Sequence, residues 1–455
     1  MRVLHTSDWH IGRRFKGVDL LDYQRTALEW LIGLIEREHV DVLCVSGDVY
    51  DLSVPSAESI RLFDTMFDRL GRLEVDGNPL EVIITPGNHD SAIRLGAGAG
   101  LMRPNVHMRC GVESLADPIV VSRGEETLAV YALPYLDPDA ARSGLQLLLE
   151  QTGVDYRIPR SHEGMMRAAL ELVTRDLASR RDGDPHLAAA LMAHVFVSGA
   201  ASSESERGIA VGGVDSVPAS LFTGSGLDYL ALGHLHRPQQ VTIPDTPAGE
   251  SVFALDRTPQ ARYSGSLLAY SFSESRTPPV VGNGKSVVLF DVSEGTVGGI
   301  RTVDVQSDEP AFVRLEGMVE EILGGLAAAH RDDWVSLTVH ASEFPQGLYQ
   351  KIDGRYTHAL EKNIVYDRRP AAAHRRAVDL RKAVSEMDVL EQFVRHQLDR
   401  DPNAKERRVL ESAVEAALNG HAEHAGGNGA GIPEAGGVVR RNGVGRVPAE
   451  ADKED

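Results

Sequence analysis

Five apolar segments of the sequence each lead into a residue that can bind a metal ion. In order, they lead into the patterns Asp-x-His, Gly-Asp-x-x-Asp, Gly-Asn-His-Asp, a single His and Gly-His-x-His. Each pattern is weak alone, because Asp-x-His arises by chance among 17 histidines and a Gly-Asp turn is usually only a turn. The ordered set is far more specific, and its potential ligands are Asp8, His10, Asp48, Asn88, His194, His234 and His236.

The types of these seven side chains indicate which ions they would hold. Imidazole, carboxylate and amide groups without a thiolate suit Mn, Fe or Zn better than Cu(I) or a structural zinc site. Seven ligands exceed the need of one ion, so two ions with a bridging carboxylate are implied. Two ions about 3.5 to 4 Å apart suit hydrolysis of a phosphate ester, because they activate water and stabilise the leaving oxygen.

The segments that carry these residues read as an α/β domain, since short apolar runs alternate with segments of helical period. Strands are predicted at 3–6, 42–45, 82–85, 128–132, 191–195 and 229–232. Helices are predicted at 22–38, 56–72 and 164–180, the second with Ser56 as its N-cap. Ligands collect at the carboxyl ends of strands in open α/β sheets, so we expect the seven side chains to converge on one rim.

The second half of the chain has a different organisation. A Pro/Gly-rich stretch at 276–284 reads as a linker. Strand patterns at 287–290, 312–315, 334–339 and 364–366, with a helix at 318–330 and another later, predict a smaller α/β unit. Two apolar stripes then predict paired helices, with Asp401 as N-cap and Pro402 as first residue of the second helix, which stops at Asn419-Gly420. The last segment, 420–455, is Gly-rich and aperiodic and is therefore predicted to be disordered.

Composition limits the classes of protein that remain. A length of 455 residues predicts about three domains. The net charge of −19 argues against holding nucleic acid by overall basicity, though it allows a local basic groove. Two cysteines, Cys44 and Cys110, exclude a disulfide framework and favour a reducing, cytoplasmic setting. We expect no signal peptide and no membrane span, because the N-terminus turns polar early and no apolar run approaches about 18 residues.

The motifs resemble those of the calcineurin-like metallophosphoesterase superfamily and, within it, the SbcD family, the bacterial counterparts of the double-strand-break repair nuclease. The resemblance covers roughly residues 1–419, and its most specific stretches are 8–12, 47–51, 53–55, 86–91, 228–239, 263–266 and 271–274. It implies a four-layer α/β sandwich of two mixed sheets flanked by helices at 1–275 and a smaller α/β capping domain at 285–370. It also implies a C-terminal helical hairpin at 375–419 that binds an SbcC-type ATPase, followed by a disordered tail at 420–455.

The resemblance also implies roles for individual residues. One Mn²⁺ ion would be held by Asp8, His10, Asp48 and His236, and the other by Asp48, Asn88, His194 and His234. Asp48 would therefore be the bridge. His89 matches the catalytic histidine, which contacts the scissile phosphate and assists proton transfer to the leaving group. Asp51 stands where archaeal and eukaryotic relatives carry a second active-site histidine, which argues against a mechanism that uses two histidines here.

The function implied is that of a DNA nuclease in repair, recombination and replication. The expected activities are 3′–5′ double-strand exonuclease and single-strand or hairpin endonuclease, carried out by a homodimer within a heterotetramer. Arg13, Arg14, Lys16 and Arg94 are candidate DNA contacts, because they follow the site motifs directly, although a solvated loop face would look the same.

Two alternatives to a nuclease stay open. One is a metallophosphatase or cyclic nucleotide phosphodiesterase of small substrates, since the fold alone does not name the substrate. Protein phosphatases of the superfamily usually have Arg and Glu where this chain has Leu52 and Asp90. The other is a non-catalytic scaffold, which the retention of all seven potential ligands disfavours.

Overall fold

The protein, seen here as a computed structural model, is described over residues 1–203, 205–206, 216–245, 257–274, 281–341, 346–366, 385–398 and 400–424. The chain divides into two compact units, Met1–Asp367 and Arg368–Asp455. Much of the predicted linker at 276–284 and most of the predicted tail at 420–455 lie outside the described residues. None of the helices in the described ranges combines the length and apolar character needed to cross a bilayer.

The first sheet of the larger unit has six strands in the order β16-β15-β1-β4-β7-β8. The strands β1, β4, β7 and β8 are parallel, and β15 is antiparallel to β1. Apolar faces of α1 and α2 pack against this sheet, and Ser56 caps α2 as predicted by accepting a hydrogen bond from Ser59 N. The bounds are β1 Arg2–Thr6, α1 Leu21–Arg37, β4 Val42–Ser46, α2 Ala57–Arg72, β7 Glu81–Thr85, β8 Val106–Met108, β15 Ser286–Ser293 and β16 Thr296–Asp304.

The second sheet has six strands in the order β13-β14-β12-β11-β10-β9. Its four inner strands are parallel and its two edge strands are antiparallel, so both sheets are mixed as expected. Two helices pack on its outer face, α5 as predicted and α4, which the sequence patterns did not predict. The bounds are β9 Ile119–Arg123, β10 Glu126–Ala132, α4 Arg142–Gln151, α5 His162–Gly183, β11 Ala188–His194, β12 Tyr229–Gly233, β13 Gln239–Val241 and β14 Gln260–Tyr263.

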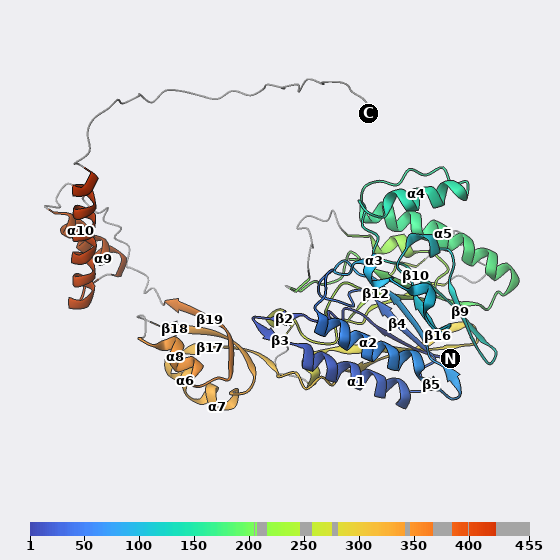
Figure 1. Ribbon diagram of the computed structural model, residues 1–455, viewed down its shortest axis with the longest axis horizontal. Coiled ribbons are helices and arrows are strands. Elements are labelled where there is room, and N and C mark those ends of the chain that lie inside the picture. Colours follow the sequence, from blue (N-terminus) through green and yellow to red (C-terminus); the bar gives the residue numbers. More distant parts are fainter. Residues whose placement is uncertain are drawn as a thin grey trace, which may run out of the picture. The chain divides into compact units, whose positions relative to one another are not determined.

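A continuous apolar layer joins the two sheets. Val42 and Ile83 of the first sheet and Met192 and Tyr229 of the second belong to one buried cluster. Cys44 lies in the same layer, where burial raises the pKa of its thiol to about 12. The stacking of helices, sheet, sheet and helices, visible in Figure 1 between α1 with α2 and α4 with α5, is the expected four-layer α/β sandwich.

The strand predicted at 287–290 forms, but it does not start the smaller α/β unit. It lies within β15 and completes the first sheet beside β1. The reason is its apolar character on both faces: Val288 and Phe290 enter the layer between the sheets, and Val287 and Leu289 enter the core under α1. The separate small sheet therefore begins at Phe312, not near 285.

The small sheet contains three parallel strands in the order β17-β18-β19. The single helix predicted at 318–330 is instead two short helices, because Gly324 leaves the helical conformation with φ −105° and ψ −114°. Trp334 of β18 packs with Phe15 and Phe312 in the core of the first sheet. The bounds are β17 Phe312–Met318, α6 Val319–Leu323, α7 Gly325–Ala329, β18 Trp334–Ala341, α8 Leu348–Asp353 and β19 His358–Tyr366.

The remaining elements in the described part of the larger unit are short. Small hairpins and one helical turn lie in the first 100 residues, and 3₁₀ turns occur between the main elements. Their bounds are β2 Arg14–Phe15, β3 Val18–Asp19, β5 Glu74–Val75, β6 Asn78–Pro79, α3 Ala92–Leu95, η1 Ala99–Leu101, η2 Val112–Ser114, η3 Ala219–Phe222, η4 Phe272–Glu274 and η5 Val281–Gly284.

The described part of the second unit is a pair of helices, α9 Glu386–Leu398 and α10 Ala404–His424. The predicted N-cap of the second helix is wrong: Asn403 Oδ1 accepts the backbone N–H groups of Lys405 and Glu406, while the Asp401 carboxylate pairs with Arg395. The predicted stop at Asn419-Gly420 is also wrong. One glycine costs a helix only about 1 kcal/mol, and the residues after it continue α10 to His424.

Candidate metal centre

Strand ends from both sheets carry the predicted ligands to one place. The loops after β1, β4 and β7 supply ligands from the first sheet, and the end of β11 and the loop after β12 supply them from the second. A chain of contacts between pairs of side chains or their backbone connects all seven, as the following paragraphs describe. The predicted rim therefore exists, and it contains Asp8, His10, Asp48, Asn88, His194, His234 and His236.

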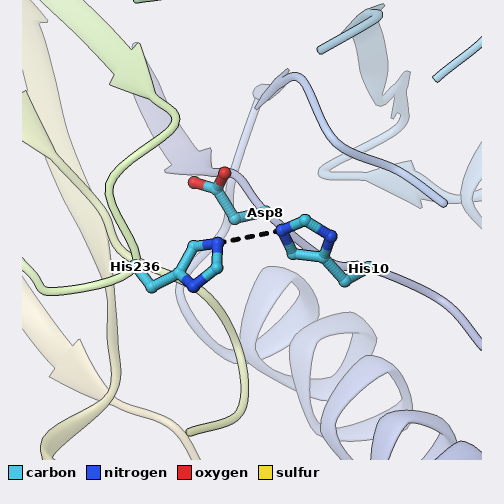
Figure 2. A group of neighbouring side chains, drawn as sticks. All are labelled: Asp8, His10 and His236. Carbon is cyan, nitrogen blue, oxygen red and sulfur yellow. Dashed lines mark hydrogen bonds between the residues drawn. The ribbon is translucent and has the colours of Figure 1, made fainter. Parts of the chain in front are cut away.

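One group of ligands surrounds His10. Nε2 of His10 lies 2.9 Å from Nε2 of His236, the contact drawn in Figure 2, and Asp8 lies beside both rings. The Asp8 carboxylate also accepts the backbone N–H of His234 at 3.1 Å. The side chains of Asp8, His10 and His236 are buried, so their ligating atoms meet away from bulk water.

A second group surrounds Asn88. Its Oδ1 lies 2.9 Å from Nε2 of His194 and 3.0 Å from Nδ1 of His234. Asp48 lies between the two groups, because its Oδ2 is 3.5 Å from Nε2 of His10 and 3.4 Å from Nε2 of His194. A single carboxylate oxygen therefore faces ligands of both groups.

Burial keeps three of the imidazoles at the site uncharged. It lowers the pKa of His10 to about 4 and that of His234 to about 3, and it lowers the pKa of His236 as well. These rings are therefore neutral near pH 7 and each keeps one nitrogen lone pair. Neutral imidazole is the form that binds metal ions.

The two aspartates and His194 are electrostatically linked. Burial opposes the charge of Asp48, but the neighbouring imidazoles of His194, His10 and His89 together outweigh it and hold the pKa of Asp48 well below its usual value. Burial similarly opposes the charge of His194, yet Asp48 and Asp8 raise its pKa to about 9. Burial raises the pKa of Asp8 to about 7. In the absence of a metal ion, His194 is thus protonated near pH 7 and compensates the buried carboxylates; a divalent cation bound here would replace that proton and take over the compensation.

The backbone at the site is held in unusual conformations. Four residues have positive φ, a region that non-glycine residues seldom adopt, and the values are 53° for Asp8, 44° for His10, 51° for Asp48 and 102° for His234. Such conformations cost of order 1–3 kcal/mol each and persist where the surrounding structure enforces them. The surrounding structure therefore holds these four residues in place against a local conformational cost.

Glycines in two motifs allow the loops to approach one another. A Cβ on Gly87 would lie 2.1 Å from Oδ1 of Asp48, and a Cβ on Gly233 would lie 1.9 Å from the carbonyl oxygen of Ser46. Real contacts of Cβ atoms are never this short. The glycines of Gly-Asn-His-Asp and Gly-His-x-His are thus required by close packing, the first against Asp48 and the second against Ser46 and His194.

His89 lies next to Asp48 and is almost fully buried. Its backbone N–H donates to Oδ1 of Asp48 at 2.9 Å, and its Nδ1 donates to the backbone carbonyl of Asp51 at 2.8 Å. Nε2 lies 4.0 Å from Oδ2 of Asp48. The ring is therefore fixed through Nδ1, with Nε2 toward the carboxylate that the two ligand groups share.

Two further aspartates brace these loops. The Asp90 carboxylate accepts the backbone N–H groups of Val49, Tyr50 and Gly87, which ties the loop after β4 to the loop after β7. The Asp51 carboxylate lies 3.4 Å from Nδ1 of His10 and 3.2 Å from Arg13. The sequence suggested Asp90 only as a possible partner of His89 within one turn, because contacts between separate loops are not visible in local patterns.

The four basic residues proposed as DNA contacts have different environments. Arg13 is largely buried, bonded to Asp51 and the Ser205 carbonyl and placed over the ring of Tyr270. Arg14 is exposed and pairs with Asp19. The other two also contact the protein: Lys16 pairs with Glu361 of β19, and Arg94 donates to the carbonyl of Ser53.

Comparison with known proteins gives the family. Residues 1–238 match the family described as calcineurin-like phosphoesterase. The SbcD subunit of the nuclease SbcCD from Bacillus subtilis (strain 168) is 35% identical over 312 residues, which is 68% of this chain and 71% of that protein.

A solved structure also resembles the chain, at low sequence identity. The structure titled "GAP50 the anchor in the inner membrane complex of Plasmodium" has a TM-score of 0.33 and 11% identity, and the match covers 67% of this chain and 89% of that one. The family match and the 35% identical relative agree with the four-layer sandwich, and the chain belongs to the SbcD family of calcineurin-like phosphoesterases.

Proposed function

We propose that this chain is the nuclease subunit of an SbcC–SbcD type complex and hydrolyses DNA phosphodiesters with two divalent metal ions, Mn²⁺ in the cell. The observation that carries the proposal is the place of Asp48 Oδ2 between the His10 group and the His194 group. A phosphoesterase site with one shared carboxylate and separate ligands on either side suits a pair of ions.

The ligand assignment follows this division. One ion takes Asp8, His10, Asp48 and His236; the other takes Asp48, Asn88, His194 and His234. When bound, the ions supply activation of the attacking water and stabilisation of charge on the phosphate oxygens. The protein holds the ligands in place through short loops braced by Asp90 and by backbone amides.

His89 is proposed as the residue that assists the leaving group. Because Nδ1 is held by the Asp51 carbonyl, Nε2 is the ring atom that can contact a phosphate oxygen and hold or release a proton. A general acid of this kind contributes about 10²- to 10⁴-fold to the rate. The leaving group in DNA cleavage is a 3′ oxygen.

The substrate and partners are proposed from the relative, a subunit of the nuclease SbcCD. The proposed activities are 3′–5′ exonuclease on duplex DNA and endonuclease on single strands and hairpins, in repair, recombination and replication in the cytoplasm. The helical pair of the second unit is the proposed binding element for the coiled-coil base of the ATPase, in a heterotetramer with two copies of this chain. Arg13, Arg14, Lys16 and Arg94 are proposed to contact the DNA backbone.

The test is an assay with end-labelled duplex and hairpin DNA and Mn²⁺, with and without the co-purified ATPase. We expect cleavage that requires metal and is lost in Asp48→Ala. A cyclic nucleotide and p-nitrophenyl phosphate are tested in parallel. Rapid hydrolysis of either compound beside inert DNA would contradict the proposal and favour a phosphatase or phosphodiesterase of small substrates.

A further inference from the structure

A buried ion pair lies beside the metal centre without supplying a proposed ligand. Lys285 and Glu274 contact each other, and both side chains are only 2% exposed. Nζ of Lys285 also donates to Ser266 Oγ at 2.9 Å and to the backbone carbonyl of His236 at 2.8 Å. A buried pair is costly unless its remaining hydrogen-bonding capacity is used, and here part of that capacity is used on His236.

The carboxylate of the pair reaches the ring of His236 through one hydroxyl. Oγ of Ser205 lies 2.7 Å from Oε1 of Glu274 and 2.6 Å from Nδ1 of His236. Oγ of Ser203 also lies 2.8 Å from Oγ of Ser205, but the Ser203 hydroxyl donates its hydrogen to the Glu206 carboxylate.

The single hydroxyl hydrogen of Ser205 sets the direction of this chain. A carboxylate only accepts, so the hydrogen points to Glu274, and the Ser205 oxygen is left to accept from Nδ1–H of His236. That tautomer leaves Nε2 of His236 without a proton. Nε2 is the atom that faces His10.

The pair also joins the two halves of the sandwich. Lys285 directly precedes β15 of the first sheet, and His236 follows β12 of the second. Asp8 and His10 follow β1, the neighbour of β15. The contact of Lys285 with the His236 carbonyl therefore connects His236, from the second sheet, to the first sheet, which carries Asp8 and His10.

Two of the other proposed ligand imidazoles, which face Asp48, are held differently. Nδ1 of His194 donates to the backbone carbonyl of Ser46 at 3.0 Å, a partner that substitution cannot remove. Nδ1 of His10 is 3.4 Å from the Asp51 carboxylate. Within the described residues, His236 is the proposed ligand whose ring is set by a side-chain hydroxyl backed by a carboxylate.

We propose that Glu274 is a positioning residue for His236, acting through Ser205 and held by Lys285, so that His236 Nε2 is presented unprotonated to the ion shared with Asp8 and His10. The inference rests on the proposed metal centre. It assigns a role to the Ser-Phe-Ser-Glu motif, which neither the ligand set nor the catalytic histidine uses.

Metal affinity of the full-length chain tests the inference. The metal-free protein is titrated with Mn²⁺, and free ion is followed by electron paramagnetic resonance; the Co²⁺-loaded protein is compared by its visible spectrum. Glu274→Gln and Ser205→Ala should each weaken one Mn²⁺ site about 10- to 100-fold, leave the other unchanged and alter the Co²⁺ spectrum. Ser205→Thr keeps the hydroxyl and should restore wild-type binding.

Asp228→Asn is the matched control. Asp228 is a buried carboxylate paired with Arg181 and Arg257, and it precedes β12, at the end of that strand away from the ligands. The Asp228→Asn substitution should lower the thermal midpoint of unfolding without changing the affinity for Mn²⁺. If Glu274→Gln does not fold, Ser205→Ala and Ser205→Thr decide, because they leave the ion pair intact.

The outcomes separate the two proposals. A wild-type chain that bound no Mn²⁺ would overturn the metal centre and, with it, this inference. If the wild type bound two Mn²⁺ ions and Ser205→Ala bound both with the same affinities and gave the same Co²⁺ spectrum, only the positioning role would be overturned.

Discussion

At the scale of single residues, His89 differs from its neighbours in which of its atoms are engaged. His89 donates Nδ1 to the Asp51 carbonyl, as His194 does to the Ser46 carbonyl, but Nε2 of His89 lies 4.0 Å from the Asp48 carboxylate, whereas Nε2 of His194 lies 2.9 Å from Asn88. His89 can therefore be changed without removing a ligand. The proposed function gives metal binding to the ligands and proton transfer to His89, and substitutions can test whether these two roles are separate.

We predict that His89→Asn reduces DNA cleavage at least about 100-fold, the lower range for loss of a general acid, while Mn²⁺ content stays near that of wild type. Asp48→Ala should lose DNA cleavage and bound Mn²⁺ together, because the Asp48 carboxylate faces both groups of proposed ligands. Rates on end-labelled DNA and metal content by mass spectrometry give the two readouts. Full nuclease rate in His89→Asn would show that its assigned role is wrong.

Glu309 gives a second prediction for one residue. Burial raises the pKa of its carboxyl to about 8; Lys285 opposes this shift and Glu274 adds to it. The folded state thus favours the protonated acid, so stability should fall as the pH rises from about 4.5, the unfolded value, to about 8. Each pKa unit is worth about 1.4 kcal/mol.

Glu309→Gln should remove this pH dependence, since the amide cannot ionise while its oxygen can still accept from Ala269 N and Asn283. Thermal midpoints at pH 5 and pH 8 measure the effect, and the wild type should lose more between them than the variant. Equal losses in the two proteins would show that Glu309 is not ionising in this range.

At the scale of elements, the site depends on loops that cross within van der Waals distance. The loop after β7 passes directly over Asp48, and only glycine fits at position 87. The Asp90 carboxylate then holds this loop to the one after β4. Ligand geometry is thus a property of pairs of loops and not of one strand end.

We expect Gly87→Ala to displace Asp48 and to lower Mn²⁺ affinity and DNA cleavage at least tenfold, because the added methyl group would lie 2.1 Å from its carboxylate oxygen. Gly183→Ala, at the end of α5 with open space around its Cβ position, is the matched control and should keep both properties. Metal titration and cleavage assays are made on both. Wild-type behaviour of Gly87→Ala would mean that the loops separate easily.

At the scale of the whole molecule, the chain contains two compact units with different proposed tasks. All seven proposed ligands and the small three-stranded sheet belong to Met1–Asp367. The helices α9 and α10 belong to Arg368–Asp455 and are linked to each other by an Arg407–Glu391 ion pair. Hydrolysis and partner binding should therefore be separable.

A chain that ends at Asp367 should keep wild-type Mn²⁺ affinity and hydrolysis of bis(p-nitrophenyl) phosphate, and it should no longer co-purify with the ATPase. Co-purification from cells that express both proteins measures the second property. Retained binding of the ATPase would move the proposed partner site from the helical pair to the larger unit.

Local sequence patterns were enough to predict the main strands and the side chains that converge at one rim. Apolar runs bounded by turn residues predicted β1, β4, β7, β10, β11 and β12, and the polar residues that follow five of them are those that meet at the rim. The convergence was predictable because parallel strands bring their carboxyl ends to one edge of a sheet, independently of the conformation of the loops. Helices α1 and α2 were predicted for the similar reason that their apolar patterns, and the Ser56 cap of α2, are local.

Features that depend on residues distant in sequence became visible in the folded protein alone. Whether 287–290 began a new unit or completed the first sheet depended on pairing with β1, which no local pattern encodes. The same holds for the chain from Lys285 through Glu274 and Ser205 to His236, whose members are brought together by the stacking of two sheets. Side-chain type is local and can be read from the sequence, whereas hydrogen-bond partners across a core are set by packing.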